Sequence, residues 1–554
     1  MHFSLITAPL SGDRTRAGSS TARRLLAAGF CTVLLSAPLA AEGFDLPATA
    51  DGEPPGAFEA ELGDSFDISL EDAVVEALRH NVSLVVERYA RSRSLLGIEE
   101  AMGIYDFNLG AFVSTSSDSR PTSSLLEDAD ILSTDVDVWN FSLSRLLAWG
   151  GTAEITFNNS KTESSNEFVQ PNPQFSVAWN IGVTQPLLRG FGRDVTERNI
   201  VVARNNVGIN HEAFRLQVES VIQQVSNEYW SLVGAMEQLE VAEQSLELAK
   251  ELHEMNRIQV DVGTKAPLEM VQSEAGVARR EEDIIRRRQA VEDAQDILRQ
   301  LINIAAGQLW DVPIVPVTNP EIAHQPIDVK AAVEKAFEMR ADIIQQRLRN
   351  DTSRLDAMVA KNSMKPRLDL TAGYGLNAIA GTFDFIDNTT GARVLSESNY
   401  GDALDSILDR EFDGWRVSLD FAMPLENRAA RARAAQAELT VKQGEWQLRD
   451  LEGTVRLGVR RAARAVETAH KAIESAKVSS RLAEKNLEAE RKRYENGLST
   501  SFQVLEIQED LSEAQSSEVA AIIGYRQALT AYHLATGELL DKYGIKLQDG
   551  NAAE

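Results

Sequence analysis

The chain has 554 residues, 43% of them hydrophobic, and carries a formal charge of −27. Because the phosphates of nucleic acids require clustered cations, this acidic balance disfavours DNA or RNA as a partner. The single cysteine, Cys31, excludes an internal disulfide and a cysteine cluster that could hold a metal.

The N-terminus has the pattern of a secretory signal. Arginines at positions 14, 16, 23 and 24 precede an apolar run over residues 25–39, and Ala40 and Ala41 follow. We therefore predict a signal peptide over residues 1–41, removed together with Cys31, with a disordered start as the alternative. No later segment has the ~20 apolar residues of a transmembrane helix. If the exported chain enters a membrane, it must do so as β-strands.

Two halves of the chain follow one plan. Ile68–Ala73 is matched by Ile327–Ala332 at a shift of 259, and Val260–Gly263 by Tyr494–Gly497 at a shift of 234. Each half has the order helix, strands, proline, long helix, glycine turn, helix. The prolines that mark the junctions from strand to helix are Pro186 and Pro424. Such internal repetition predicts two structural repeats.

These matches define the expected domains. A flexible linker over residues 42–66 is followed by the first repeat, residues 67–305. A second linker, residues 306–326, leads to the second repeat, residues 327–542. A tail over residues 543–554 ends the chain.

Several segments alternate strictly between apolar and polar residues. Every odd position is apolar from Phe175 to Val183 and from Trp415 to Met423, and residues 368–376 alternate in the same way. One apolar and one polar face fits a half-buried strand of a soluble sandwich. A membrane barrel shows the same period over ~10 residues, and the predicted export favours it. Four to six strands cannot close a wide pore, so several chains must share one barrel.

The first half has an additional alternating pair, Trp139–Leu143 and Ile155–Phe157, with a turn at residues 149–151. We expect this hairpin to extend a strand or to fold outside the barrel. A wider barrel with six strands per chain is the alternative. Ser116–Asp137 and Ala378–Asp413 are predicted to be exposed loops.

The helical segments are long. Residues 428–494 contain no proline, and ~65 helical residues span ~100 Å at 1.5 Å each. Apolar residues follow three- and four-residue spacing from Leu451 to Tyr494, with Glu490 as the one charged interruption, and a similar stripe runs from Val225 to Val260. This repeat predicts coiled-coil packing.

Gly263 and Gly497 are predicted to end the long helices, because glycine suits the left-handed residue that closes a helix. The chain restarts at Pro267 in one copy, and Thr500 and Gln503 have capping-box spacing in the other. Each glycine is therefore the predicted tip of an antiparallel helical hairpin.

Together these features resemble the TolC family of outer-membrane efflux proteins, the outer membrane factors. The resemblance covers roughly residues 67–542 and rests on Ser69–Ala73, Gln185–Leu188, Tyr494–Gly497 and Phe502–Glu506. It implies an α+β membrane protein whose long antiparallel coiled-coil hairpins form a periplasmic tunnel. Strands from a homotrimer would share one transmembrane barrel of twelve strands, one strand pair for each half of the chain.

The resemblance also implies a function. The trimer would be the outer-membrane duct of a tripartite efflux or type I secretion system in a Gram-negative-type bacterium, with a large periplasmic portion. It would dock on a periplasmic adaptor and a proton-driven or ATP-driven inner-membrane pump, and would pass substrates passively to the exterior.

Site residues follow from the same resemblance. The closed periplasmic aperture corresponds to Gln503 and Glu506, with Glu269 and Gln272 in the first copy. Tyr494 matches a tyrosine that tethers the closed tip, and the hairpin tips at Gly263 and Gly497 would dock the adaptor. The sequence departs from the family at Gln503, where an acid is expected, and at Ser499, where the tethering pattern has an arginine. A threefold ring of carboxylates would favour cations; the alternative is that Glu269 and Glu506 are ordinary solvated helix positions.

Other classes of protein fit less well. No glycine-rich phosphate loop, zincin pattern or nucleophile elbow is present, so we predict neither catalysis nor a cofactor nor a metal site. The alternative function is a periplasmic coiled-coil adaptor or a structural envelope protein. Adaptors generally have one helical hairpin and a membrane anchor, whereas this chain has two predicted hairpins and two sets of strands.

Overall fold

The computed structural model describes residues 65–121, 131–166, 168–304, 310–320, 322–323, 326–386 and 391–547. The predicted signal peptide, and the predicted linker up to residue 64, lie outside these ranges. The described residues form two compact units. The strand unit contains Tyr105–Leu187 and Leu368–Phe421, and the helical unit contains the rest. Within the described ranges, no helix combines the length and the apolar character needed to cross a bilayer.

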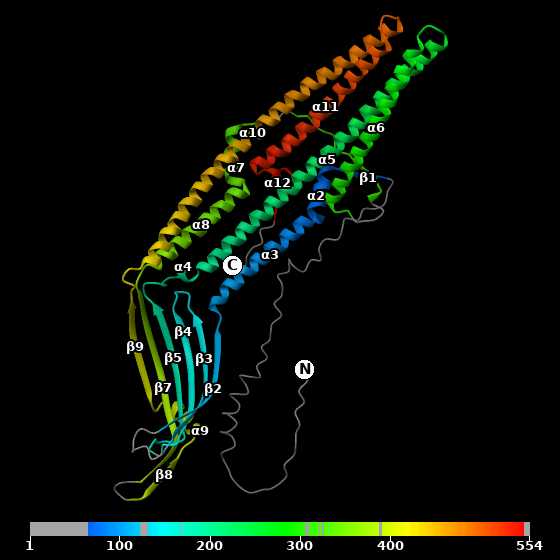
Figure 1. Ribbon diagram of the computed structural model, residues 1–554. Coiled ribbons are helices and arrows are strands. Elements are labelled where there is room, and N and C mark those ends of the chain that lie inside the picture. Colours follow the sequence, from blue (N-terminus) through cyan, green and yellow to red (C-terminus); the bar gives the residue numbers. More distant parts are fainter. Residues whose placement is uncertain are drawn as a thin grey trace, which may run out of the picture. The chain divides into compact units, whose positions relative to one another are not determined.

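A seven-stranded sheet is the main element of the strand unit (Figure 1). Its strands are β2 (Asn108–Pro121), β3 (Ile131–Leu146), β4 (Thr152–Ser164), β5 (Gln174–Pro186), β7 (Arg367–Ile386), β8 (Arg393–Glu397) and β9 (Asp413–Ala422). They are ordered β2-β3-β4-β5-β7-β8, and β9 also pairs with β7. Each pair whose register is defined is antiparallel.

The register places the alternating apolar residues of the strands on one face. Trp179 of β5 lies opposite Phe157 of β4 and Leu376 of β7, and Phe157 lies opposite Phe141 of β3. Since successive side chains point to opposite faces, the intervening polar residues form the other face. The sheet is therefore amphipathic, as the sequence predicts.

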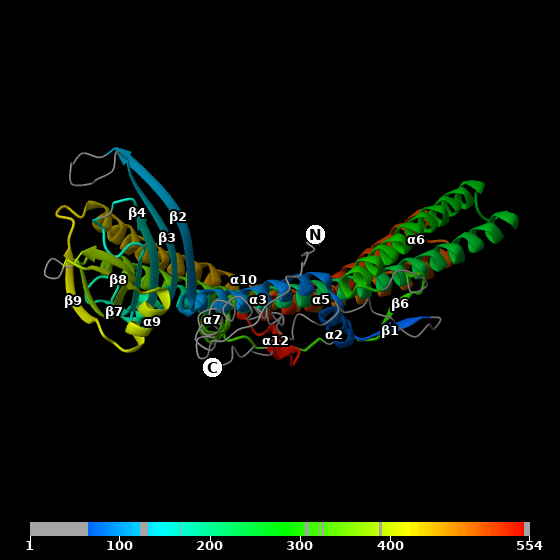
Figure 2. The same cartoon turned by 90° about the horizontal axis from the view of Figure 1, so that it is seen from below.

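The additional hairpin of the first half lies within this sheet as β3 and β4. Both strands are paired on both sides, β3 with β2 and β4, and β4 with β3 and β5 (Figures 1 and 2). The hairpin therefore adds two strands to the sheet instead of extending one of the others, and its place within or outside a barrel stays a prediction. The turn at residues 149–151 is confirmed, because Leu147 N donates to Gly151 O at 2.7 Å and Gly150 N to Leu147 O at 2.8 Å.

Two predicted loops are also wrong where the structure describes them. Residues 116–121 continue β2 and pair with residues 131–136 at the start of β3. Residues 378–386 continue β7, and the rest of that insertion contains β8 and helix α9 (Tyr400–Leu408). Residues 116–121 lack apolar alternation, but backbone pairing with a neighbouring strand does not require it.

Helix α9 covers part of the apolar face of the sheet. Its Ala403 and Ile407 are buried against a cluster of Val177, Leu376, Ala378 and Ala380. The Tyr400 ring packs edge-on against Trp139 at 5.3 Å between centroids, and its hydroxyl donates to Asn159 Oδ1 at 2.8 Å. This contact satisfies an asparagine side chain that is only 2% exposed among apolar neighbours.

The helical unit contains two similar series of helices. The first series is α2 (Leu70–His80), α3 (Val82–Met102), α4 (Arg193–Thr196), α5 (Arg198–Asp261) and α6 (Pro267–Ile302). The second is α7 (Val329–Met339), α8 (Ala341–Asn362), α10 (Arg428–Glu495), α11 (Ser501–Thr536) and α12 (Leu539–Lys542). We call α5 with α6 the first helix pair and α10 with α11 the second. With 68 residues, α10 is about 100 Å long.

The core of the helical unit is centred on α5, where Tyr229 and Trp230 are almost fully buried. The Tyr229 hydroxyl donates to Ile68 O at 3.1 Å and accepts from Thr318 N at 3.0 Å. Ile68 belongs to β1 (Phe66–Ile68), which pairs in parallel with β6 (Ile314–Pro316). The segment predicted as a linker over residues 306–326 therefore contains a strand that α5 holds in place.

Candidate functional site

The turns of the two helix pairs have the same backbone structure. Gly263 has φ 79° and Gly497 has φ 71°, the left-handed region that favours glycine. In the first turn Gly263 N donates to Val260 O at 2.9 Å, and in the second Gly497 N donates to Tyr494 O at 3.0 Å. The helix ends predicted at these glycines are confirmed, as is Pro267 at the first position of α6.

Tyr494, near the end of α10, joins the second helix pair to the first. Its ring is 2% exposed, and its hydroxyl donates to Asn256 Oδ1 on α5. Asn256 Nδ2 in turn donates to Glu269 O on α6 at 3.3 Å. Burial, followed by the charge of Glu269, raises the pKa of Tyr494 to about 12. The hydroxyl therefore stays protonated, and able to donate, throughout the physiological range of pH.

Glu269 makes a second connection between the helix pairs. Its Oε2 accepts from Ser501 Oγ and, at 3.2 Å, from Ser501 N. Ser501 is the first residue of α11 and is fully buried. A carboxylate at a helix N-terminus is stabilised by unpaired backbone N–H groups and by the helix dipole. Glu269 is therefore not an ordinary solvated position, although its predicted place in an aperture stays a prediction.

The two positions at which the sequence departs from the TolC pattern lie together. Ser499 Oγ donates to Glu490 Oε1 and lies 3.0 Å from Gln503 Oε1. Glu490 is the charged residue that interrupts the apolar stripe, and its other oxygen accepts from Arg493 Nη1 at 3.0 Å. The buried Glu490 carboxylate thus accepts hydrogen bonds from both Ser499 and Arg493 at this turn.

Further contacts join the second helix pair to α5. Arg491 on α10 forms an ion pair with Glu251 on α5 at 2.9 Å, and Gln508 Nε2 on α11 donates to Leu248 O at 3.0 Å. The apolar members of the cluster are Leu252, Leu487, Tyr494, Val504 and Leu511. We call these polar and apolar contacts together the tip latch.

The remaining predicted aperture residues lie differently. Gln503 and Glu506 are exposed on the first turns of α11, and Gln272 is half-buried on α6. Among the hydrogen bonds and ion pairs of the described residues, none joins Gln272 or Glu506 to the tip latch. The sequence missed Asn256 and Ser501 as partners. Asn256 could have been found, because it lies seven residues after the buried Ala249 and so continues the heptad stripe of α5.

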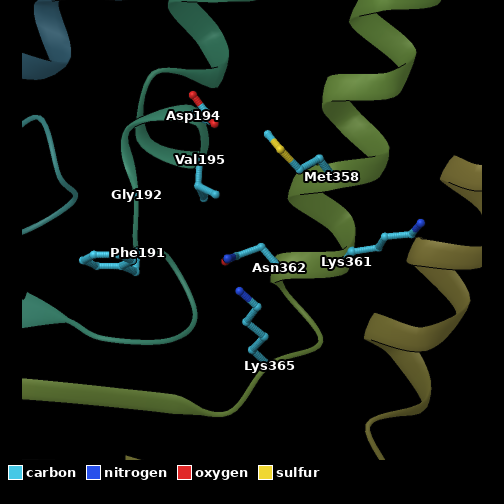
Figure 3. A pocket seen from close by; sticks show the side chains of 8 residues that line it. All are labelled: Phe191, Gly192, Asp194, Val195, Met358, Lys361, Asn362 and Lys365. Atoms are coloured by element: carbon cyan, nitrogen blue, oxygen red, sulfur yellow. The ribbon is translucent and has the colours of Figure 1, made fainter.

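A separate cavity of about 340 Å³ lies in the helical unit between the loop after Leu188 and α8 (Figure 3). Asn362 anchors this loop, since its Oδ1 accepts from Gly190 N at 2.8 Å. On the lining of the cavity, Lys361 forms an ion pair with Glu438 at 2.8 Å. In the described part of the chain, no group of three histidine, cysteine, aspartate or glutamate side chains is placed to hold a metal ion.

The model of the outer membrane efflux protein family matches residues 152–303 and 332–538, more than half of the chain. The chain belongs to the outer membrane efflux protein family. This confirms the predicted resemblance to TolC-like proteins, and the family consists of channel proteins rather than enzymes. Strands β4, β5, β7 and β9 of this efflux protein lie within the matched residues, whereas β2 and β3 precede them.

Solved structures of outer-membrane channels share the fold of this efflux protein. The Campylobacter jejuni channel CmeC matches with a TM-score of 0.59 and 15% identity, over 85% of this chain and 86% of that chain. The outer-membrane channel OprN matches with a TM-score of 0.61 and 15% identity, over 89% and 96%. The open state of Neisseria gonorrhoeae MtrE gives 0.55 and 16%, over 90% and 97%. No curated protein sequence matches the chain.

Proposed function

We propose that this efflux protein is one subunit of a homotrimeric outer-membrane duct. Strands of three copies would close one transmembrane β-barrel, and their helix pairs would form a periplasmic coiled-coil tunnel. The tunnel would receive substrates from a periplasmic adaptor and an inner-membrane pump, proton-driven or ATP-driven. Export through the duct itself would be passive, in a tripartite efflux or type I secretion system.

The observation that carries this proposal is the exposed apolar face of the sheet. Leu109 on β2, Ile155 on β4 and Ile181 on β5 lie in one row across the sheet and are 66%, 36% and 41% exposed, and Trp415 on β9 is 78% exposed. A contiguous apolar surface of this kind marks contact with a membrane or with another protein. Strand lengths of 10 to 20 residues for β2, β3, β4, β5, β7 and β9 reach the ~9–11 residues that cross a bilayer.

The two edges of the sheet support a shared barrel. Within the described residues, β2 pairs only with β3, and β9 pairs only with β7. An open edge exposes a row of backbone N–H and C=O groups that lipid cannot satisfy. Pairing β2 of one copy with β9 of the next would satisfy both rows, which a single chain cannot do.

The tip latch supports a closed periplasmic end. Tyr494 and Glu269 hold the two helix pairs of one chain together, while Gln503 and Glu506 beside them are exposed. We propose that Glu269, Gln272, Gln503 and Glu506 surround the aperture in the trimer, and that the turns at Gly263 and Gly497 contact the adaptor.

The direct test of the proposed function is pore formation. We expect the mature protein to fractionate with the outer membrane, to migrate as a heat-modifiable trimer, and to form ion-conducting pores in planar bilayers. A protein that is soluble and monomeric without detergent, and that forms no pores, would instead support the adaptor alternative.

A second expected result concerns the aperture. Glu506→Gln removes one exposed carboxylate per copy, so three negative charges leave the proposed ring. We expect higher single-channel conductance or weaker block by divalent cations, because a ring of carboxylates binds such cations. Glu495→Gln is the control, since Glu495 is exposed at the end of α10 and also carries one charge per copy. Unchanged conductance and block in Glu506→Gln would remove Glu506 from the aperture.

A further inference from the structure

Strands β3 and β4 have the dimensions of membrane-spanning strands. They contain 16 and 13 residues, against the ~9–11 that cross a bilayer. Each is hydrogen-bonded along its length, β3 to β2 from Asn108↔Ser144 to Pro121↔Ile131, and β4 to β5 from Thr152↔Thr184 to Thr162↔Gln174. The hairpin is therefore an integral part of the sheet and not an appendage on its surface.

The apolar band of the sheet passes through this hairpin at constant height. One row of facing residues runs through Leu109, Leu143, Ile155, Ile181 and Tyr374, on β2, β3, β4, β5 and β7. The adjacent row of the same face runs through Ala111, Phe141, Phe157, Trp179 and Leu376, and helix α9 covers its β7 end, where Leu376 is buried. An apolar band is needed only on strands that contact lipid, so a hairpin outside the bilayer would not be expected to continue the band of its neighbours.

The opposite face is polar over the same strands. A row through Gly110, Ser142, Thr156, Asn180 and Gly375 lies between the two apolar rows. Asn180 Nδ2 donates to Thr156 Oγ1 at 3.3 Å across β4 and β5. Strands β3 and β4 thus have one face of small polar residues, as expected for a lumen, and one apolar face, as expected for contact with lipid.

We propose that three copies of this chain close an eighteen-stranded barrel, with β2, β3, β4, β5, β7 and β9 of each copy. The proposal rests on the trimeric duct proposed above and deepens it. The second copy is the partner of each open edge, since β2 and β9 are the edges of the six-stranded set. Six is an even number, so β2 of one copy meets β9 of the next in antiparallel orientation, as outer-membrane barrels require.

The expected consequence is a wide exit. Without β2 and β3, which precede the residues that the family model matches, β4, β5, β7 and β9 of three copies would give a twelve-stranded barrel. Since the diameter of a barrel grows roughly linearly with the number of strands, eighteen strands give a lumen about 1.5 times as wide. Barrels of this size hold an aqueous channel.

Cysteine labelling tests whether β3 belongs to the barrel. Phe141→Cys and Ser142→Cys are neighbours on opposite faces of β3, and Ile181→Cys and Asn180→Cys form the matched pair on β5. The only natural cysteine, Cys31, lies in the predicted signal peptide. In outer-membrane vesicles, we expect a water-soluble maleimide to label positions 142 and 180 at least tenfold faster than positions 141 and 181.

The outcomes separate this inference from the proposed function. Equal labelling of positions 141 and 142, with alternation kept at 180 and 181, would put the hairpin outside the barrel and overturn the inference alone. Loss of alternation on both strands would overturn the proposed function as well.

Electron cryomicroscopy of the detergent-solubilised trimer gives an independent measurement. We expect eighteen strands around the barrel. A variant lacking residues 107–150, which removes β2 and β3 and leaves four strands per chain, should have a perimeter smaller by a factor of about 1.5. A twelve-stranded barrel in the unmodified trimer would refute the proposal, whether or not the deletion variant assembles.

Discussion

Replacing Tyr494 by phenylalanine and Ser501 by alanine in the same chain should open the periplasmic end of the duct. The first change removes the hydroxyl that donates to Asn256, and the second removes the hydroxyl that donates to the Glu269 carboxylate. A neutral hydrogen bond contributes about 1 kcal/mol and one to a charged group about 1.5–3 kcal/mol. A loss of about 3 kcal/mol per copy favours separation of the helix pairs by about 100-fold.

Single-channel recording in planar bilayers measures this shift as a larger conductance and a higher open probability. Tyr525→Phe is the matched control, because the Tyr525 hydroxyl is also buried and donates to Ala323 O, further along α11 from the turn. We expect the control to keep the conductance and the open probability of the unmodified protein. An unchanged double variant, or a control that opens equally, would show that the tip latch does not hold the duct closed.

Much of the helical unit could be predicted because its signals are local. The buried stripe of α10 includes Val455, Val459 and Leu487, which the three- and four-residue spacing identified, and both helix-ending glycines were found from sequence. Helix ends depend on the conformation of a few residues, and heptad burial depends on spacing within one segment. Neither signal depends on which other segment of the chain the helix packs against.

The missed features depend on contacts distant in sequence. Residues 116–121 lack apolar alternation but form strand because they face residues 131–136. Helix α9 was hidden in an insertion of polar composition, and it is held by Tyr400 on Trp139 and by Ala403 and Ile407 on the sheet. The sequence showed that the charged Glu490 interrupts the apolar stripe of α10, but only the structure identifies Ser499 as its hydrogen-bond partner.

The two faces of the sheet should differ sharply in their tolerance of charge. Leu419→Arg on β9 would place a guanidinium on the apolar face, which is 61% exposed at this residue. Ser418→Arg places the same side chain on the opposite face, which Ser418 shares with Arg416 and Asp420. An arginine facing lipid near the midplane costs about 2–4 kcal/mol per chain, whereas a lumen position costs little.

We expect the amount of heat-modifiable trimer in outer-membrane extracts to fall steeply for Leu419→Arg, because about 2–4 kcal/mol shifts assembly by roughly 30- to 1000-fold. Ser418→Arg should assemble at the level of the unmodified protein and change only the conductance or ion selectivity. An equal loss of trimer in both variants would mean that β9 tolerates an arginine on neither face. Full assembly of Leu419→Arg would place the apolar face away from lipid, and the trimeric barrel would then lose its physical basis, since the exposed apolar band would have no bilayer to cover it.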